Sequence, residues 1–229
     1  MRVVETFGPT VQGEGPYAGM VCHFLRLGGC DYRCSWCDSM HAVDPAQVRL
    51  VPDLDEWAVL ARLDALAPAP MLVISGGNPA LWSLEALVKQ LRSRYEVIGV
   101  ETQGSRWRPW LVDVDSLVVS PKPPSSGEDT PHHWKQFGEF MFRTAPHPGR
   151  VLKVVIFDED DLNYARAVHE RFPATPFYLS VGTDPDDDLA AVGDRYRWLC
   201  ELVCADPRLH AARVLPQLHV VAWGHLVGV

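Results

Sequence analysis

The stretch Gly28-Gly29-Cys30-Asp31-Tyr32-Arg33-Cys34-Ser35-Trp36-Cys37-Asp38-Ser39 places three of the chain's six cysteines within eight residues. Their spacing, C-x3-C-x2-C, allows one short loop to fold three thiolates around a single inorganic centre. Iron-sulfur clusters are normally held by four thiolates. A loop with three and no obvious fourth therefore predicts an iron that is free to take an external ligand.

Other uses of these cysteines are also open. Positions i, i+4 and i+7 mark one face of a helix, where cysteine acts as a small hydrophobe, although the Gly28-Gly29 pair and the polar residues between the cysteines are typical of a loop. A structural zinc site is the stronger alternative, with the fourth ligand supplied by Cys22, Asp38 or His41. We nevertheless interpret the cysteines outside the loop as core residues, because their contexts are strand-like or helix-like: Cys22, Cys200 and Cys204.

Composition limits the class of protein. With 229 residues, 47% of them hydrophobic and 22% charged, the chain resembles an ordinary globular protein with a full core. The net charge of −8 argues against a nucleic-acid partner, which requires a basic surface. No apolar run approaches the ~20 residues of a membrane span, and the N-terminus has no signal-peptide core. We expect a cytoplasmic protein whose cysteines are thiols and metal ligands.

Strand-like and helix-like segments alternate along the chain. Apolar runs predict strands over residues 21–27, 71–75, 97–100, 117–119, 151–156 and 177–181, and helical spacing predicts helices over 54–66, 84–94, 162–172 and 189–204, the first with Asp53 as its N-cap. This order favours parallel pairing with right-handed crossovers. The units are too few for a closed eight-unit barrel. We therefore predict one α/β domain, 1–229, that forms a partial, open TIM-type (β/α) barrel of about six parallel strands.

Polar or glycine-rich residues follow several of the predicted strands. They are the cysteine loop, Gly76-Gly77, Glu101-Thr102 and Ser120-Pro121-Lys122. In parallel α/β folds ligands bind at the carboxyl ends of the strands, so these segments are expected to converge on one mouth. The Pro- and Ser-rich residues 121–131 are expected to form a loop.

The cysteine loop, with Trp36 just before its last cysteine, resembles the cluster loop of the radical S-adenosylmethionine enzymes. Further stretches extend the resemblance over nearly the whole chain to the 7-carboxy-7-deazaguanine synthase family: Gln12-Gly13-Glu14-Gly15, Phe24-Leu25-Arg26-Leu27, Glu101-Thr102-Gln103-Gly104, Ser120-Pro121-Lys122-Pro123-Pro124 and Pro216-Gln217-Leu218-His219. The resemblance implies a homodimer that converts 6-carboxy-5,6,7,8-tetrahydropterin to 7-carboxy-7-deazaguanine with loss of ammonia, on the way to queuosine. It also implies a [4Fe-4S] cluster, S-adenosylmethionine, Mg2+ and an electron donor such as flavodoxin or ferredoxin.

Carried over by position, the family's roles fall on three groups of residues. The cluster would be held by Cys30, Cys34 and Cys37, with S-adenosylmethionine chelating the open iron. The S-adenosylmethionine site would be lined by Trp36, Cys37, Asp38, Gly77, Asn78, Ser120, Pro121 and Lys122. The pterin would contact Val11, Gln12, Gly13, Glu14, Arg26 and Ser75, with Arg26 as the partner of its carboxylate.

The sequence departs from the resembled pattern at two positions. The magnesium ligand implied by the family is a threonine directly after the Cys-Asp pair, and here it is Ser39, which keeps the hydroxyl. Most radical S-adenosylmethionine enzymes carry Gly-Gly-Glu after this strand, and the glutamate meets the amino group of the cofactor. This chain has Asn78 instead, which can accept the same hydrogen bond but brings no charge.

The segment from Trp223 to Val229 is too apolar for a solvated tail and is expected to pack. The resemblance implies that the terminal carboxylate, on Val229, takes part in substrate binding. The alternative is an apolar end that docks only for stability.

Two other functions remain open from the residues alone. A radical-activating enzyme that installs a glycyl radical on a partner shares the same three-cysteine loop, but would not need the Gln12-Gly13-Glu14-Gly15 and Pro216–His219 segments. A zinc-stapled binding domain is the non-enzymatic alternative.

Overall fold

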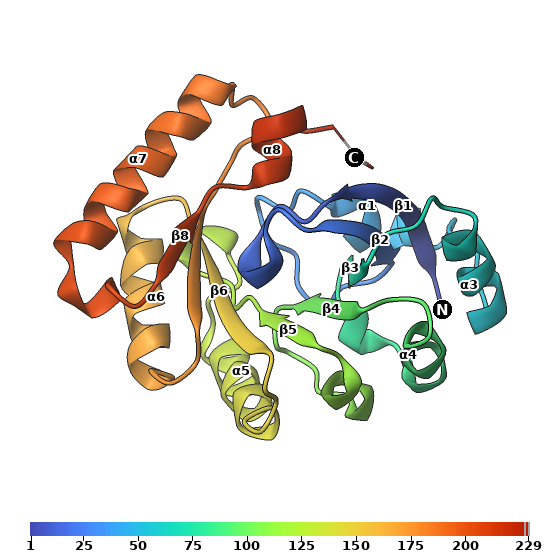
Figure 1. The fold of residues 1–229 in the computed structure, drawn as a ribbon. Coiled ribbons are helices and arrows are strands. Elements are labelled where there is room, and N and C mark those ends of the chain that lie inside the picture. Colours follow the sequence, from blue (N-terminus) through green and yellow to red (C-terminus); the bar gives the residue numbers. More distant parts are fainter. Residues whose placement is uncertain (227, 229) are drawn as a thin grey trace.

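The computed structural model describes residues 1–226 and 228, in which eight strands pair in the order in which they follow along the chain (Figure 1). Strand β1 is antiparallel to β2, and all later pairs are parallel. Within the described residues β8 and β1 do not pair, so the barrel is open, as predicted. The strands are β1 (Val3–Val11), β2 (Val21–Leu27), β3 (Met71–Gly76), β4 (Val97–Thr102), β5 (Ser116–Val119), β6 (Arg150–Ile156), β7 (Phe177–Val181) and β8 (Arg213–Leu215).

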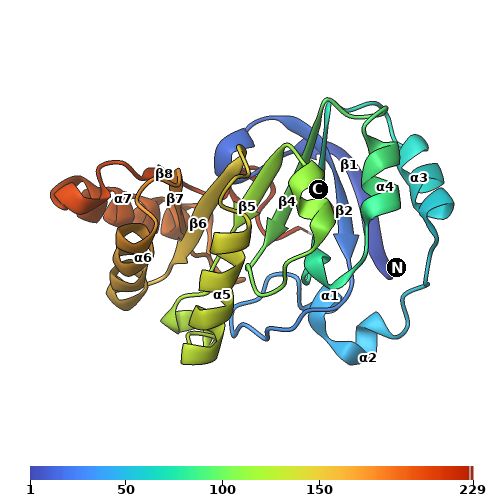
Figure 2. The ribbon, with the colours of Figure 1, turned by 90° about the horizontal axis from the view of Figure 1, so that it is seen from below.

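The longer helices cover the outer, convex face of this sheet, as Figures 1 and 2 show. They are α3 (Glu56–Asp64), α4 (Glu85–Leu91), α5 (Pro131–Arg143), α6 (Glu159–Arg171) and α7 (Leu189–Ala205). Three shorter helices, α1 (Met40–Val43), α2 (Pro45–Val48) and α8 (Leu218–Trp223), lie near the ends of the strands (Figures 1 and 2). None of the helices over 1–226 is long and apolar enough to cross a membrane.

Alternation of side chains along the strands separates the core from the site. In β3, Leu72 and Ile74 belong to the large core under the helices, whereas Met71 and Val73 lie in a smaller cluster on the concave face. Cys22 is fully buried in that smaller cluster, which confirms it as a core residue.

The sequence patterns missed the long helix α5, the strands β1 and β8, and the three short helices α1, α2 and α8. Helix α5 has apolar residues at helical spacing, a Thr130 side chain that accepts from the His133 backbone N–H at 3.1 Å, and Pro131 in its first turn. The adjoining Pro/Ser-rich stretch and the two histidines hid this signal. Strand β8 has only three residues, and β1 is rich in polar residues, so neither shows a clear apolar run.

Three smaller predictions differ from the structure. The N-cap of α3 is Asp55, which accepts from the Ala58 N–H at 2.8 Å, and not Asp53, which binds the N-terminal ammonium instead. Cys204 is exposed and Cys200 is half-buried, because α7 packs on the sheet with its other face. Parallel strands number seven instead of about six, since β8 adds one.

Candidate active site

The cysteine loop leaves the carboxyl end of β2 and is tied to the body of the protein on both sides of its first cysteine. The Gly29 N–H donates to the Ala42 carbonyl at 2.7 Å, and the Ser35 N–H donates to the Ser126 carbonyl at 2.9 Å. Cys34 is buried, and Cys30 and Cys37 are half-buried. The backbone N–H of Tyr32 donates to Cys30 Sγ at 3.4 Å. The loop therefore holds its three thiols without regular secondary structure.

The three thiols share one cationic neighbour. Burial raises the pKa of Cys30 to about 11 and also raises the pKa values of Cys34 and Cys37. The Lys122 ammonium opposes this rise at all three positions, because its charge favours thiolates. Such a set of buried thiols beside a cation suits iron ligation, since a bound metal keeps its thiol ligands deprotonated.

The contacts around the loop bear on the alternative of a single zinc ion. Among the described residues, 1–226 and 228, no three His, Cys, Asp or Glu side chains stand close enough together to hold one metal ion. Two of the three fourth ligands suggested for zinc lie next to other protein groups. Cys22 lies in the concave-face cluster with Met71 and Val73, and His41 Nε2 lies 3.5 Å from Glu5 Oε1. The Gln103 Nε2–H donates to Cys30 Sγ at 3.6 Å, a contact typical of outer-shell groups around thiolate ligands.

The glycine turn after β3 is packed against the cysteine loop. A Cβ at Gly77 would lie 2.2 Å from the Gly29 carbonyl oxygen, so only glycine allows this approach. The Asn78 N–H donates to the same carbonyl at 2.8 Å. Gly77 therefore fixes the position of the loop at its first cysteine.

Asn78 is fully buried, and other protein groups use both ends of its amide. Its Oδ1 accepts from the Thr102 hydroxyl at 2.9 Å and from the Ala80 N–H at 3.2 Å. Its Nδ2 donates to Asp31 Oδ1 at 2.9 Å and to the Ser105 hydroxyl at 3.0 Å. Both acceptor positions of the amide are therefore occupied by protein groups, which argues against a hydrogen bond from the cofactor to Asn78 Oδ1.

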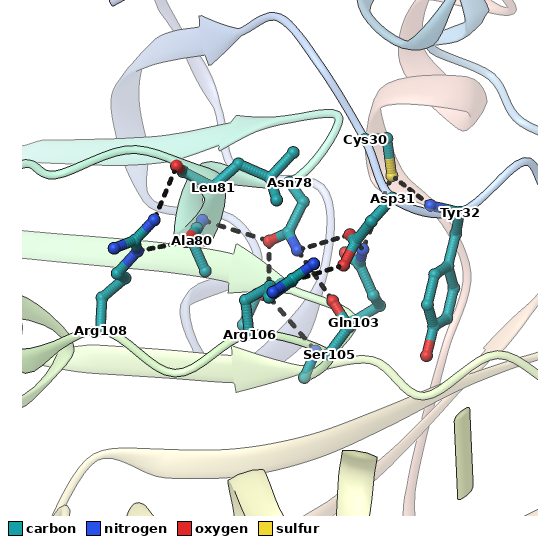
Figure 3. A network of polar contacts seen from close by, with 12 residues as sticks. Cys30, Asp31, Tyr32, Asn78, Ala80, Leu81, Gln103, Ser105, Arg106 and Arg108 are labelled. Carbon is teal, nitrogen blue, oxygen red and sulfur yellow. Dashed lines mark hydrogen bonds and ion pairs between the residues drawn. The ribbon is translucent and has the colours of Figure 1, made fainter. Parts of the chain in front are cut away.

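Figure 3 shows that this network converges on the Asp31 carboxylate, next to Cys30. Asp31 Oδ1 also accepts from Gln103 Nε2 at 2.7 Å, and Asp31 Oδ2 lies 3.5 Å from Arg106 Nε. Only the polarity of Asp31 is evident from the sequence. Its fixed orientation depends on residues that follow β3 and β4.

The other predicted cofactor residues gather across the loop. Lys122 Nζ lies 5.5 Å from the centre of the Trp36 ring and 3.4 Å from the Ser120 hydroxyl. Trp36 Nε1–H donates to the Ser125 hydroxyl at 2.9 Å. Segments that are about 90 residues apart in the chain are thus brought together, as expected for the predicted mouth.

A buried carboxylate that the sequence did not reveal supports this side of the site. Asp161 is fully buried in α6, and its oxygens accept from the Ser125 N–H at 3.0 Å and the Ser125 hydroxyl at 2.7 Å. Ser125 in turn accepts from Trp36. Asp161 therefore positions the indole through one intermediate side chain.

Arg26 and Ser39 are in direct contact. Arg26 Nη1 donates to Ser39 Oγ at 2.7 Å, and the Ser39 hydroxyl donates to Asp38 Oδ1 at 2.9 Å. Arg26 Nε pairs with Glu5 Oε1 at 2.5 Å. The predicted partner of a substrate carboxylate and the predicted metal ligand therefore lie side by side at the end of β2.

The concave face carries a second set of polar side chains. Lys153 Nζ pairs with Glu14 Oε2 at 2.5 Å, with both side chains almost completely buried. Burial raises the pKa of Glu14, but the charge and hydrogen bond of Lys153 together with the charges of His219 and Lys122 outweigh this effect, and the pKa lies below its usual value. Nearby, Glu101 accepts from Gln12 Nε2 at 2.9 Å and from the Ser75 hydroxyl at 3.3 Å. These residues line or adjoin a small cavity walled by Met71, Val73, Gly99 and Val118.

The sequence analysis expected Glu101 at the mouth without giving it a role, and it did not assign Lys153 to the site. The signal was present, because each is a charged residue at an inward position of a strand whose neighbours are apolar. Glu101 alternates with the outward-facing Val100 and Thr102, and Lys153 alternates with Leu152 and Val154, which belong to the core.

The Pro216–His219 segment packs onto the first loop. The Leu218 N–H donates to the Gly13 carbonyl at 3.0 Å, and a Cβ at Gly13 would lie 2.1 Å from His219 Nδ1. Val11 ends β1, paired with Val21. Val229, the predicted position of a substrate-binding carboxylate, lies outside the described residues.

Comparisons with known proteins bear on the family and on the fold. A 7-carboxy-7-deazaguanine synthase from Bacillus cereus is 39% identical over 237 residues, with 99% of this chain and 98% of the relative covered. The protein of the same name from Bacillus subtilis is 38% identical, with the same coverage. The crystal structure of QueE from Escherichia coli matches with a TM-score of 0.64 over 94% of this chain and 93% of that one, and at 19% identity this likeness shows the fold. No protein-family model matches the chain.

Proposed function

The chain belongs to the 7-carboxy-7-deazaguanine synthase family, and we propose that it converts 6-carboxy-5,6,7,8-tetrahydropterin to 7-carboxy-7-deazaguanine, a queuosine precursor, with release of ammonia. The observation that carries this proposal is the meeting of the three-cysteine loop and a polar concave face in one open barrel. Arg26, Ser39 and Asp38 join the two through direct hydrogen bonds.

Cys30, Cys34 and Cys37 are proposed to hold a [4Fe-4S] cluster, and the loop spacing leaves one iron for S-adenosylmethionine. Together these groups supply the radical that removes one hydrogen atom from the substrate. The protein then has to place the substrate and exclude water. Gln103 Nε2 and the Tyr32 N–H hold Cys30 Sγ in place.

The cofactor site is proposed to include Trp36, Cys37, Asp38, Gly77, Ser120, Pro121 and Lys122. Support comes from the contacts of Trp36 with Lys122 and Ser125, which give the indole one orientation. Asn78 is left out of this group, because its amide is used within the protein.

The substrate is proposed to bind against the concave face, with contacts to Val11, Gln12, Gly13, Glu14, Arg26 and Ser75. Glu14 Oε1 is buried without a hydrogen-bond partner in the described part of the chain, and such an acceptor is costly unless a ligand donor satisfies it. A pterin ring offers N–H donors of this kind. Glu101 is added to the proposed contacts, because it bonds both Gln12 and Ser75.

A magnesium ion at Ser39 is also part of the proposal. Ser39 Oγ and Asp38 Oδ1 lie 2.9 Å apart and are the hard oxygen donors that Mg2+ prefers. Arg26 donates to the same serine oxygen, so metal and substrate carboxylate are expected to bind together, the carboxylate drawing the guanidinium away from Ser39. Family resemblance further supports a homodimer and a small electron-donor protein.

The test is anaerobic incubation of the reconstituted protein with 6-carboxytetrahydropterin, S-adenosylmethionine and a chemical reductant. We expect a product with the mass and ultraviolet spectrum of the deazapurine, together with one ammonia per turnover. Cys34→Ala is the matched control and should give no product. Cofactor cleavage without deazapurine formation would contradict the proposed substrate but not the radical chemistry.

A further inference from the structure

Asn78 occupies the position at which the resembled enzymes carry a glutamate for the amino group of S-adenosylmethionine. Its side chain is fully buried and makes four hydrogen bonds within the protein. An amide without charge and without a vacant acceptor cannot replace the carboxylate directly. The amino group would therefore need another acceptor near the first cysteine.

Asp31 is the carboxylate that Asn78 holds. Its Oδ1 accepts from two neutral amides, Asn78 Nδ2 at 2.9 Å and Gln103 Nε2 at 2.7 Å. The same Gln103 nitrogen lies 3.6 Å from Cys30 Sγ, which places the carboxylate beside the cluster loop (Figure 3). The amides orient Asp31 but leave its negative charge uncompensated.

The second oxygen has only a loose partner. Asp31 Oδ2 lies 3.5 Å from Arg106 Nε, and the Arg106 side chain is 59% exposed, whereas that of Asp31 is 20% exposed. An exposed ion pair of this length contributes little, because solvent screens it. A ligand amino group can replace Arg106 at this oxygen without disturbing the two amide bonds.

We propose that Asp31 is the cofactor-binding carboxylate of this enzyme, accepting a hydrogen bond from the amino group of S-adenosylmethionine through Oδ2. Asn78 and Gln103 are then positioning residues that fix the carboxylate. The negative charge is supplied by the residue after the first cysteine instead of by the glycine-rich turn. This inference rests on the proposed function, because it requires S-adenosylmethionine at the open iron.

The test is equilibrium dialysis of labelled S-adenosylmethionine against the anaerobically reconstituted protein with its cluster oxidised, so that the cofactor binds without being cleaved. Asp31→Asn keeps the shape and removes the charge, and we expect its Kd to rise at least about tenfold at unchanged iron content, since a charge-assisted hydrogen bond is lost. Arg106→Gln is the matched control, because it removes only the ion-pair partner. Its Kd should stay within about twofold of the parent value, as expected for loss of an exposed pair.

An analogue of S-adenosylmethionine that lacks the amino group identifies the contact. The analogue also lacks an iron ligand, so both proteins should bind it more weakly than S-adenosylmethionine, but the loss of affinity should be about tenfold larger for the parent than for Asp31→Asn, in which the carboxylate partner is already gone. Should Asp31→Asn lose iron, Asp31→Glu replaces it in the same comparison. In Asp31→Glu the carboxylate lies one methylene group farther from the backbone, and this change should again weaken the binding of S-adenosylmethionine more than the binding of the analogue.

Equal affinity of the parent and Asp31→Asn for S-adenosylmethionine would overturn the inference. An Arg106→Gln variant that bound S-adenosylmethionine as weakly as Asp31→Asn would also overturn the inference, because the effect of Asp31 would then come from its ion pair with Arg106. If the parent itself bound no S-adenosylmethionine, the proposed function would fail. This result differs from a failure of the inference about Asp31, in which the parent still binds the cofactor.

Discussion

Two sides of the same mouth hold their carboxylates in opposite ways. Beside the cysteine loop, Asp31 is held by the side-chain amides of Asn78 and Gln103, which orient it without neutralising it. On the concave face, Glu14 is held by the buried ammonium of Lys153, which cancels its charge. The neutral amides leave the negative charge of Asp31 available to a ligand. The ion pair with Lys153 instead compensates the charge of Glu14, and only the Oε1 atom of Glu14 is left for a ligand.

The comparison makes different predictions for the loss of each supporting group. Removing Lys153 leaves a buried charge without compensation, which is among the most costly changes a protein core can undergo. Removing Asn78 leaves polar groups without partners but no new uncompensated charge. The first change should therefore have the larger effect.

Lys153→Met is expected to lower the free energy of unfolding by about 3–5 kcal/mol, since Glu14 stays buried and ionised. Urea denaturation of the two proteins measures this difference. The double variant Glu14→Gln/Lys153→Met removes both charges at similar volume and should recover most of the loss. A double variant as unstable as the single one would show that Lys153 acts through packing.

Asn78→Ala is expected to lower the free energy of unfolding by about 2–3 kcal/mol, because buried groups such as the Thr102 hydroxyl lose their partner. The same denaturation experiment measures it. Ser93→Ala removes an exposed hydroxyl from the surface and is the matched control, with a change within about 0.5 kcal/mol. A cost as small as that of the control would mean that the amide network does not hold the turn.

The pH dependence of stability tests the Glu14–Lys153 ion pair separately from the hydrogen-bond network of Asn78. The pKa of Glu14 lies below its ordinary value of 4.5, and that of Lys153 lies above its ordinary value of 10.5. The stabilisation by Glu14 is therefore present above about pH 4.5 and is lost as the pH falls through the lowered pKa. The stabilisation by Lys153 is present below about pH 10.5 and is lost as the pH rises through the raised pKa of Lys153.

We expect the stability of the parent relative to Glu14→Gln/Lys153→Met to stay constant across neutral pH. It should decline only below the ordinary carboxyl range or above the ordinary lysine range. Denaturation curves at a series of pH values test this expectation. A decline centred near neutrality would contradict the pairing.

Ser39→Ala should have the smallest effect on the fold, within about 1 kcal/mol, because it removes one partly exposed set of hydrogen bonds. The variant should keep its cluster iron but show weaker stimulation of turnover by Mg2+. Measuring the rate against Mg2+ concentration decides the point. Stimulation equal to that of the parent would exclude Ser39 as the metal ligand.

The sequence predicts the fold where the local signal is strong. Met71–Ile74 is a continuous apolar run, and the structure makes it a strand buried on both faces. Helix α5 has an N-cap and helical spacing, but Gly138 and two histidines weaken the pattern. Strand β8 has too few residues to show any pattern.

The candidate site was predictable where one short segment carries it and not where distant segments combine. Three cysteines in one loop are visible in the sequence. The role of Asn78 depends on Thr102 and Ser105, which come from a different strand end, so only the packed structure shows that its amide is already used. The same is true of Asp161, which reaches Trp36 through Ser125.

The central claim is that the three-cysteine loop holds a cluster with one iron open to S-adenosylmethionine. The most direct measurement is electron paramagnetic resonance of the anaerobically reconstituted and reduced protein, with iron counted in the same sample. We predict roughly four iron atoms per chain and a cluster signal whose shape changes when S-adenosylmethionine is added. A protein that retains zinc instead of iron, or a cluster signal that is unchanged by S-adenosylmethionine, would contradict the claim.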